Sequence, residues 1–281
     1  MRLLRLLEPV QNVAANSHFV LNSKLVLGNV VERLILVLGG TFTKAQITNL
    51  QVRLNGKTTI GPVSGTHLDT IQKYLLLVND ANRLTIDFTE PTSRSIPGQL
   101  MGAVHTDASG VTDFTIEGDI GAATSPTLAV YAQMRSVADL DPARGFDPGT
   151  FGLMRALVPT TVTETAAGEF QHDLNYGVKG DTLIKRIFIF SSVLTAFKIR
   201  RDSIEVYDAI PTALAGYIQA EYGRDDQSGL YVFDPLVDGN QSDVLTTRTG
   251  NRETQFQFLF TASGSGVHTV YTDLYAPLSR I

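Results

Sequence analysis

The chain has 281 residues, 43% of them hydrophobic and 18% charged, which provides enough apolar material for one large domain or two ordinary ones and excludes disorder over most of the length. Its formal net charge is −5, and its lysines and arginines are scattered singly, so we expect no direct nucleic-acid binding. Cysteine is absent, which excludes disulfides, thiolate metal sites and cysteine nucleophiles.

The first residues, MRLLRLL, combine leucines with two arginines. The spacing of Arg2 and Arg5 predicts a short helix with both arginines on one side. Two interpretations are open: a terminal helix docked on the protein, or a membrane-surface contact in which the arginines meet anionic headgroups. The apolar stretch is too short for a signal peptide, and no run approaches the roughly 20 residues of a membrane span. We therefore expect a protein made and kept in a cytoplasm.

Most of the chain has the pattern of short β-strands. These segments carry β-branched or aromatic residues, several in alternation, with turn residues between them. Such strands at this spacing predict β-sandwiches. In chain order the predicted strands are 31–38, 49–56, 84–88, 112–119, 127–133, 183–190, 202–209, 230–234, 254–260 and 268–275.

Two stretches predict helices. Residues 65–78 place apolar side chains on one face, with Ser64 or Thr66 as the N-terminal cap. Residues 211–223 do the same, with Pro211 in the first turn and Gly223 as the stop.

The two halves repeat one order of elements. VVERLILVLGG (30–40) and TLIKRIFIFSS (182–192) each set a Glu-Arg or Lys-Arg pair before an unbroken apolar run. A second strand follows in each half, 49–56 or 202–209, and then the helix and further strands. A lone helix at the same place in each half is hard to obtain by chance, so we infer two copies of one β-sandwich.

The predicted domains are an N-terminal sandwich, 1–135, and a C-terminal sandwich, 168–281, with 136–167 as the connector. The stretch ADLDPARGFDPGTFG (138–152) contains two Asp-Pro steps and three glycines. This composition predicts an extended connector.

No pattern in the chain supports catalysis, and we expect no enzyme. The five histidines stand at 18, 67, 105, 172 and 268, none at metal-ligand spacing from another, and both the His-x-His pair of cupins and a Gly-x-Ser-x-Gly elbow are missing. Glu117 and Asp119 lie two apart on a predicted strand and share a face, as a glycosidase pair does. A solvent-facing edge of a sandwich is the simpler explanation.

The acidic stretch DPLVDGNQSD offers oxygen ligands of the kind that calcium takes: Asp234, Asp238, Asn240 and Asp243. Its spacing departs from that of an EF-hand loop, and an acidic turn explains it equally well. Calcium is the one cofactor candidate, with these four residues as its ligands.

Four stretches together carry a family resemblance. PVQNVAAN (9–16) and FTKAQITNLQVRLNGK (42–57) resemble the N-terminal region of the major capsid protein of corticoviruses, tailless icosahedral bacteriophages with an internal lipid membrane. TLAVYAQ (127–133) and IQAEYG (218–223) continue the resemblance in the same order. The long Asp-Pro connector departs from the corticovirus pattern, which points to a relative among tailless phages of this lineage. The matching positions include Asn12, Val13, Ala14, Ala15, Gln46, Ile47, Asn49, Val52, Leu54 and Gly56.

The resemblance implies an all-β fold, a double jelly roll made of two tandem eight-stranded antiparallel β-sandwiches, each with one short helix. It implies a homotrimer of six sandwiches, a pseudo-hexagonal tile that self-assembles into the icosahedral capsid of a virion over an internal membrane. The expected partners are further copies of the chain, vertex or penton proteins, minor capsid or membrane proteins, and the viral inner membrane. The family's calcium binding is not assigned to named residues of this sequence.

Two other functions remain as alternatives. A tandem β-sandwich that binds glycans, as in a spike or lectin, uses exposed aromatic residues in loops, but tryptophan is absent and most tyrosines fall in predicted strands or helices. An enzyme, either a glycosidase around Glu117 or a bicupin, lacks the acid pair or the metal ligands. We favour the capsid interpretation.

Overall fold

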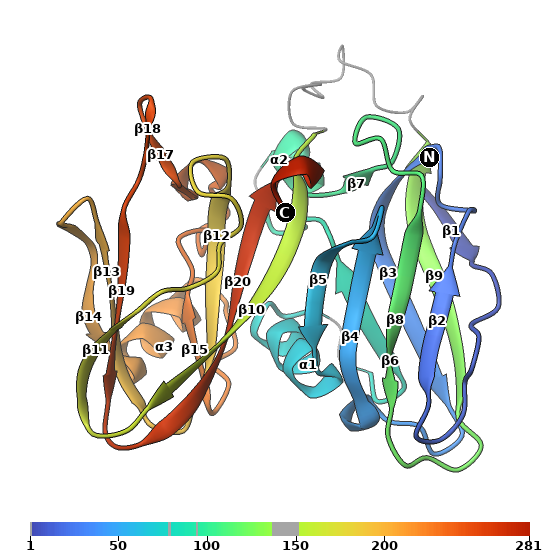
Figure 1. Ribbon diagram of the computed structural model, residues 1–281, viewed down its shortest axis with the longest axis horizontal. Coiled ribbons are helices and arrows are strands. Elements are labelled where there is room, and N and C mark those ends of the chain that lie inside the picture. The colour runs from blue at the N-terminus through green and yellow to red at the C-terminus, as the bar shows by residue number, and fades with distance from the viewer. Residues whose placement is uncertain (1, 78–79, 94, 137–151) are drawn as a thin grey trace.

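The computed structural model describes residues 2–77, 80–93, 95–136 and 152–281. Two β-sandwiches stand side by side with their strands in roughly the same direction (Figure 1). We call them the first and the second sandwich. The predicted connector stretch 138–151 lies outside the described residues, and residues 154–164, also assigned to the connector, form a strand of the second sandwich.

The first sandwich has eight main strands in two sheets, as predicted. One sheet has the order β1–β9–β3–β6, and the other β5–β4–β8–β2. Short β7 (Val104–His105) pairs with β3. The main strands are β1 (Arg2–Leu6), β2 (His18–Asn22), β3 (Asn29–Gly39), β4 (Ile47–Leu54), β5 (Lys57–Val63), β6 (Arg83–Asp87), β8 (Phe114–Ile120) and β9 (Thr127–Ser136).

The second sandwich repeats this topology strand by strand. Its sheets have the orders β10–β20–β12–β15 and β11–β19–β13–β14, and short β16 (Leu245–Thr246) pairs with β12 as β7 pairs with β3. The predicted duplication is therefore present in the sheet order itself. The strands are β10 (Met154–Glu164), β11 (Gly168–His172), β12 (Leu183–Phe190), β13 (Leu194–Arg201), β14 (Ile204–Pro211), β15 (Leu230–Phe233), β19 (Phe256–Ala262) and β20 (Gly266–Ala276), with a small hairpin of β17 (Arg248–Thr249) and β18 (Arg252–Glu253).

One detail of the predicted alignment is wrong. Residues 49–56 fall mainly in β4, whose counterpart is β13, whereas residues 202–209 fall mainly in β14, the counterpart of β5. The mismatch arises because β5 and β13 were not predicted. In β5 the glycine and proline of KTTIGPV interrupt the strand pattern.

Both predicted helices are confirmed and occupy equivalent places. α1 (Gly65–Tyr74) begins after Ser64, whose hydroxyl accepts a hydrogen bond from the His67 amide, and α3 (Thr212–Glu221) begins after a proline. Gln72 of α1 donates to the Thr85 carbonyl, and Gln219 of α3 donates to the carbonyl at position 232 over the same spacing of 13 residues. The short α2 (Ile96–Leu100) and the 3-10 turns η1 (Lys44–Gln46), η5 (Gln241–Asp243) and η6 (Leu278–Arg280) were not predicted.

The N-terminal helix prediction is wrong, because residues 2–6 form β1, which pairs antiparallel with β9. Arg2 and Arg5 are three apart, so the strand alternation directs them to opposite faces. Backbone pairing with β9 stabilises this conformation over a helix that would hold only a turn or so.

Candidate functional site: the seam between the two sandwiches

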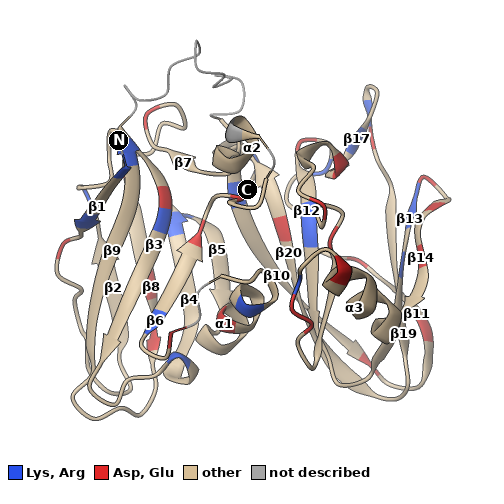
Figure 2. Cartoon of the chain, turned by 180° about the vertical axis from the view of Figure 1, so that it is seen from behind, with Lys and Arg blue, Asp and Glu red and all other residues tan. Residues whose placement is uncertain are grey.

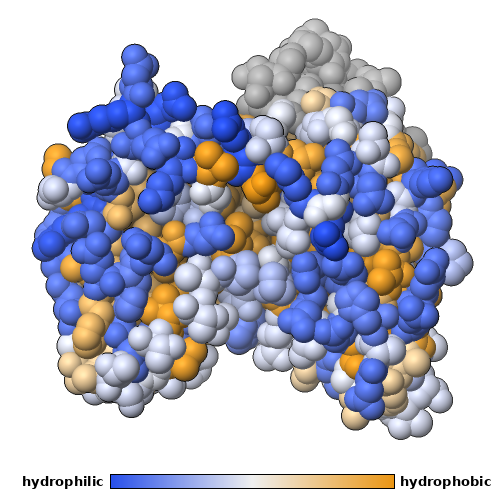
Figure 3. Space-filling model, in the orientation of Figure 1, coloured by the Kyte–Doolittle hydropathy of each residue, from blue (hydrophilic) through white to orange (hydrophobic). Residues whose placement is uncertain are grey.

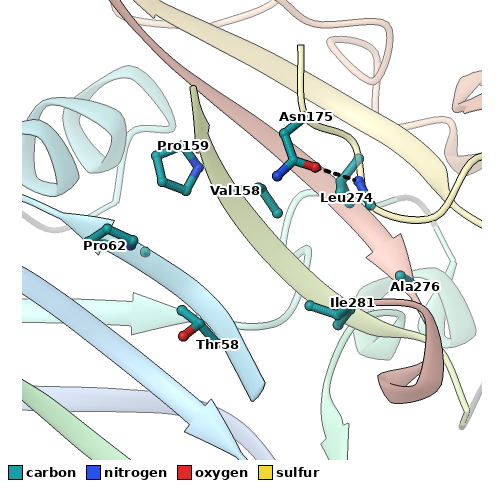
Figure 4. A pocket seen from close by; sticks show the side chains of 10 residues that line it. Thr58, Pro62, Val158, Pro159, Asn175, Leu274, Ala276 and Ile281 are labelled. Atoms are coloured by element: carbon teal, nitrogen blue, oxygen red, sulfur yellow. Dashed lines mark hydrogen bonds between the residues drawn. The ribbon is translucent and has the colours of Figure 1, made fainter. Parts of the chain in front are cut away.

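The contact between the sandwiches, here called the seam, joins two sheets into one. β10 of the second sandwich pairs parallel with β5 of the first, with Leu157 opposite Ile60. β10 also pairs antiparallel with β20, so a nine-stranded sheet runs through both sandwiches. A cavity of about 320 Å³ lies beside this junction and is lined from both sandwiches, by Thr58 and Pro62 on one side and Val158 and Leu274 on the other (Figure 4).

Helix α1 docks on the second sandwich at the seam. The His67 ring stacks on Phe190 with 4.0 Å between ring centroids, and its Nδ1 lies 2.9 Å from the Tyr271 hydroxyl. Tyr74 makes an edge contact with Phe188. The hydrophobic core of the first sandwich accordingly extends into β12 and β20, and apolar residues line the hollow between the two halves (Figure 3).

β12 is apolar on both faces for this reason. Ile187 and Ile189 pack in the core of the second sandwich, while Phe188 faces the core of the first and Phe190 packs against it. A strand covered on both sides has a continuous apolar run rather than an alternating one. The run IFIF thus follows from the position of β12 at the seam.

The Lys-Arg pair before that run forms a buried ionic cluster. Arg186, fully buried, donates to Glu90 of the first sandwich at 2.6 and 3.2 Å and to Asp234 at 2.7 Å. Lys185 lies 2.8 Å from the same Glu90 carboxylate and 3.6 Å from Asp273. Positive and negative segments meet between the halves in Figure 2.

Arg155 extends the cluster along β10. Its guanidinium binds both Asp273 oxygens at 2.7 and 2.9 Å and also donates to the backbone carbonyl of Asp87 in the first sandwich. Arg224 lies 3.2 Å from Asp234, and the Tyr74 hydroxyl donates to that carboxylate at 3.2 Å. The cluster therefore ties α1 and the turn after β6 to three strands of the second sandwich.

The electrostatics favour the ionised state at the centre of the cluster. Burial alone raises the pKa of Glu90, but Arg186 and Lys185 outweigh burial and hold that pKa well below its usual range. The pKa of Arg186 lies well above its usual range, because Asp234 and Glu90 overcome the effect of burial. Buried charges are tolerated only when they are paired and hydrogen-bonded, so the two sandwiches have one specific relative placement.

The first sandwich has the same charged positions, but around a surface cavity. Arg33 donates to Asp87 as Arg186 donates to Asp234, and both arginines follow a β-bulge residue, Glu32 in β3 and Lys185 in β12. Arg135 and Arg2 pair with Glu32 at 2.8 and 3.1 Å. Arg2 corresponds in register to Arg155 of the second sandwich.

The repeated Glu-Arg and Lys-Arg pairs are visible in the sequence, but Arg186, Lys185 and Glu90 were not predicted as site residues. A usable signal was present, since two cations directly before an apolar run that is covered on both faces require buried partners. Nothing in the sequence shows which carboxylate supplies them. Glu90 and Arg186 are 96 positions apart.

The four calcium candidates have different surroundings. Asp234 is committed to Arg186, Arg224, Tyr74 and a backbone amide of its own turn. The other three lie in a turn in which Asp238 accepts from the Asn240 amide and Asn240 donates to Asp243. Within the described ranges no group of three or more acidic, histidine or cysteine side chains is placed to hold a metal ion. Calcium binding by Asp238, Asn240 and Asp243 stays a prediction, which titration of the wild type against Asp238→Ala and Asp243→Ala tests.

The two carboxylates considered for glycoside hydrolysis face outward from β8. This strand lies between β4 and β2, so it is not the sheet edge that we expected. Asp119 lies 2.7 Å from both His18 and Asn49, and hydrogen bonds from these two residues lower its pKa. Glu117 lies 3.3 Å from Arg53. The general acid of a glycosidase needs a raised pKa. The lowered pKa of Asp119 therefore does not suit it to act as that acid.

Two family models match the chain in order: the viral coat protein P2 N-terminal domain over residues 4–135 and the viral coat protein P2 C-terminal domain over residues 154–278. No curated protein sequence matches. None of the helices in the described ranges has the length and apolarity to cross a membrane.

Solved capsid structures have the same fold. The chain is similar to the major capsid protein P2 from bacteriophage PM2, with 20% identity, a TM-score of 0.84 and coverage of 100% of this chain and 99% of that one. It is also similar to a chain of the Sulfolobus turreted icosahedral virus structure (12% identity, TM-score 0.68, coverage 99% and 91%) and to the PBCV-1 virus capsid (10%, 0.61, 98% and 93%). These matches give the glycan-binding alternative no support. Since the two models leave out only the chain ends and residues 136–153, the chain belongs to the viral coat protein P2 family and is a structural capsid protein of a virion.

Proposed function

We propose that three copies of the chain form a pseudo-hexagonal capsomer, which tiles the capsid by self-association and without catalysis. The observation that carries this proposal is the buried cluster of Arg186, Lys185 and Glu90, because it makes two equivalent sandwiches one rigid body. Three such two-lobed bodies supply six equivalent lobes. A closed ring of this kind needs head-to-tail contacts in which one surface meets a different surface of the next copy.

The experiment is sedimentation equilibrium of the purified chain at micromolar concentration. A stable mass near three times 30.5 kDa supports the capsomer. A monomer that persists across concentration and salt overturns it.

The further partners that we propose are neighbouring capsomers, vertex or penton proteins, minor capsid or membrane proteins, and an inner viral membrane. The acidic net charge of −5 supports a shell separated from DNA by such a layer. Membrane contact through Arg2 and Arg5 stays a prediction, and in β1 only one of the two can face a given lipid surface. Flotation with anionic liposomes, compared between the full chain and a chain lacking residues 1–8, tests it; equal flotation removes it.

A further inference from the structure

We propose that the second sandwich of one copy docks on the first sandwich of a second copy in the way that the first docks on the second within the chain. In this arrangement β14 of one copy pairs parallel with β1 of its neighbour, and α3 packs on the outer face of the neighbour's β3 and β9. This docking rests on the proposed trimer and names its contact surface.

The two strands that pair in this docking are free sheet edges in the single chain. Within the chain, β10 and β5 pair with each other at the seam, so neither is a free edge. Their counterparts by topology are β1 and β14, and each of these ends its sheet. β1 and β14 lie at opposite outer sides of the molecule in Figures 1 and 2, so one chain cannot pair them with each other. An exposed edge strand is a template for pairing with another chain.

Apolar exposure marks the same two strands. All five residues of β1 are exposed, with 66% of Leu4 accessible, although Leu4 corresponds to buried Leu157 of β10. In β14, Ile204 is 69% exposed and Val206 is also exposed. Apolar side chains that recur on both free edges indicate a surface that is covered in the assembly.

The helix gives a second, independent argument. α1 covers Phe188, Phe190 and Tyr271 within the chain. The positions equivalent to these three are Ile35, Val37 and Tyr131 on β3 and β9, which are only half-buried. β3 therefore has the continuous apolar run of a strand covered on both faces, yet one face lacks a complete cover in the chain alone.

α3 has the surface that would supply this cover. Its exposed apolar residues include Leu214, Tyr217 and Ile218, with Tyr217 64% exposed. Leu214 corresponds to His67 of α1, the residue that stacks on Phe190 at the seam. The exposed apolar surface of α3 is thus the counterpart of α1, and the outer face of β3 and β9 is the counterpart of the face of β12 and β20 on which α1 packs.

Charge is consistent with the same docking. Arg2, Glu32 and Arg33 line a cavity of about 300 Å³ whose counterpart at the seam receives Glu90. The ion pairs described at this cavity join three arginines to only two carboxylates, which leaves an excess of one positive charge. The arginines are Arg2, Arg33 and Arg135, and the carboxylates are Glu32 and Asp87.

The neighbour has an aspartate next to the matching position. The turn after β15 corresponds to the turn after β6 that carries Glu90, and both begin with an aspartate that accepts a hydrogen bond from the amide two residues on, Asp87 from Thr89 and Asp234 from Leu236. In this alignment Val237 of the turn after β15 stands at the position of Glu90, and Asp238 is the next residue. In the proposed docking, Asp238 brings one negative charge to the cavity of the neighbour.

The test is chemical cross-linking, which is specific because the chain contains no cysteine. In the proposed register Leu3 lies opposite Val206 of the neighbour, so Leu3→Cys and Val206→Cys place two exposed thiols on the same face of the paired strands and leave the Tyr207 ring in place. Treatment of this double variant with a short thiol cross-linker is expected to give covalent dimers and trimers. The matched control is Leu3→Cys with Leu76→Cys, which is exposed at 62% and lies after α1, on neither of the two free edge strands.

Sedimentation of the same samples separates the two proposals. Covalent trimers from the 3–206 variant and none from the control support the docking. A trimeric mass without 3–206 products overturns the docking and leaves the capsomer intact, whereas a monomeric mass overturns both. Leu214→Glu on α3 is expected to shift the trimer to monomer while Leu76→Glu does not; a fully trimeric Leu214→Glu protein contradicts the α3 contact.

Discussion

Arg186 of the second sandwich donates to Glu90 of the first at 2.6 Å, across 96 positions of the chain. Both side chains are buried, so this pair joins the two halves of the capsid protein in their interior, beside the β10–β5 pairing and the packing of α1. Arg33 occupies the equivalent place in the first sandwich and has its own aspartate, but there the surroundings are open to a cavity.

Glu90→Gln is expected to lower the free energy of unfolding by about 3–5 kcal/mol, because it leaves Arg186 and Lys185 buried with less compensating charge. Urea unfolding followed by fluorescence measures this change. The matched control is Glu205→Gln, which removes the exposed partner of Arg200 and is expected to cost less than about 1 kcal/mol. Equal costs for the two variants contradict a dominant role of the buried cluster.

The stability of the wild type is expected to fall in acid through Glu90. The folded pKa of Glu90 lies well below its ordinary value of 4.5, so its contribution is complete above that pH and is lost as the pH falls toward the folded pKa. Unfolding midpoints measured from neutral pH downward should show a steep acid loss in the wild type and a shallower one in Glu90→Gln. Parallel curves for the wild type and Glu90→Gln would show that Glu90 is not the source of the acid loss.

A second pH effect is expected at α1. Burial against Phe190 lowers the pKa of His67 from its ordinary value of 6.5. The contribution of His67 is therefore complete above that pH and decreases as the pH falls through the folded pKa. Since His105 and His268 also have lowered pKa values, the informative quantity is the difference between the wild type and His67→Leu, which should narrow as the pH falls below 6.5. A stability difference between the two proteins that stays constant with pH would show that His67 does not cause the pH effect.

Ser64→Ala is expected to destabilise the protein by about 1 kcal/mol, since Ser64 caps α1 by accepting a hydrogen bond from the His67 amide. Thermal unfolding gives the size of the loss. Thr66→Ala is the control, because Thr66 lies inside α1 and does not cap it. A larger loss in Thr66→Ala than in Ser64→Ala would show that the cap has been placed wrongly.

Much of the fold was predictable because its signals are local. Strand alternation, turn residues and the Ser64 cap each act over a few positions, and the duplication follows from their order. The N-terminal strand was not predictable, since RLLRL has no strand alternation and is held in β1 by pairing with β9. The seam was missed for a related reason: the partners of Arg186 and Lys185 come from a turn in the other sandwich, and only the folded chain brings Glu90 to them.

The most direct test of the account is two-dimensional class averaging of the purified capsomer by electron microscopy. A trimeric capsomer with the proposed docking is expected to give a closed ring of six similar lobes with threefold symmetry, in which seams within chains alternate with contacts between chains. Isolated two-lobed particles, or open chains of lobes that do not close, would contradict it.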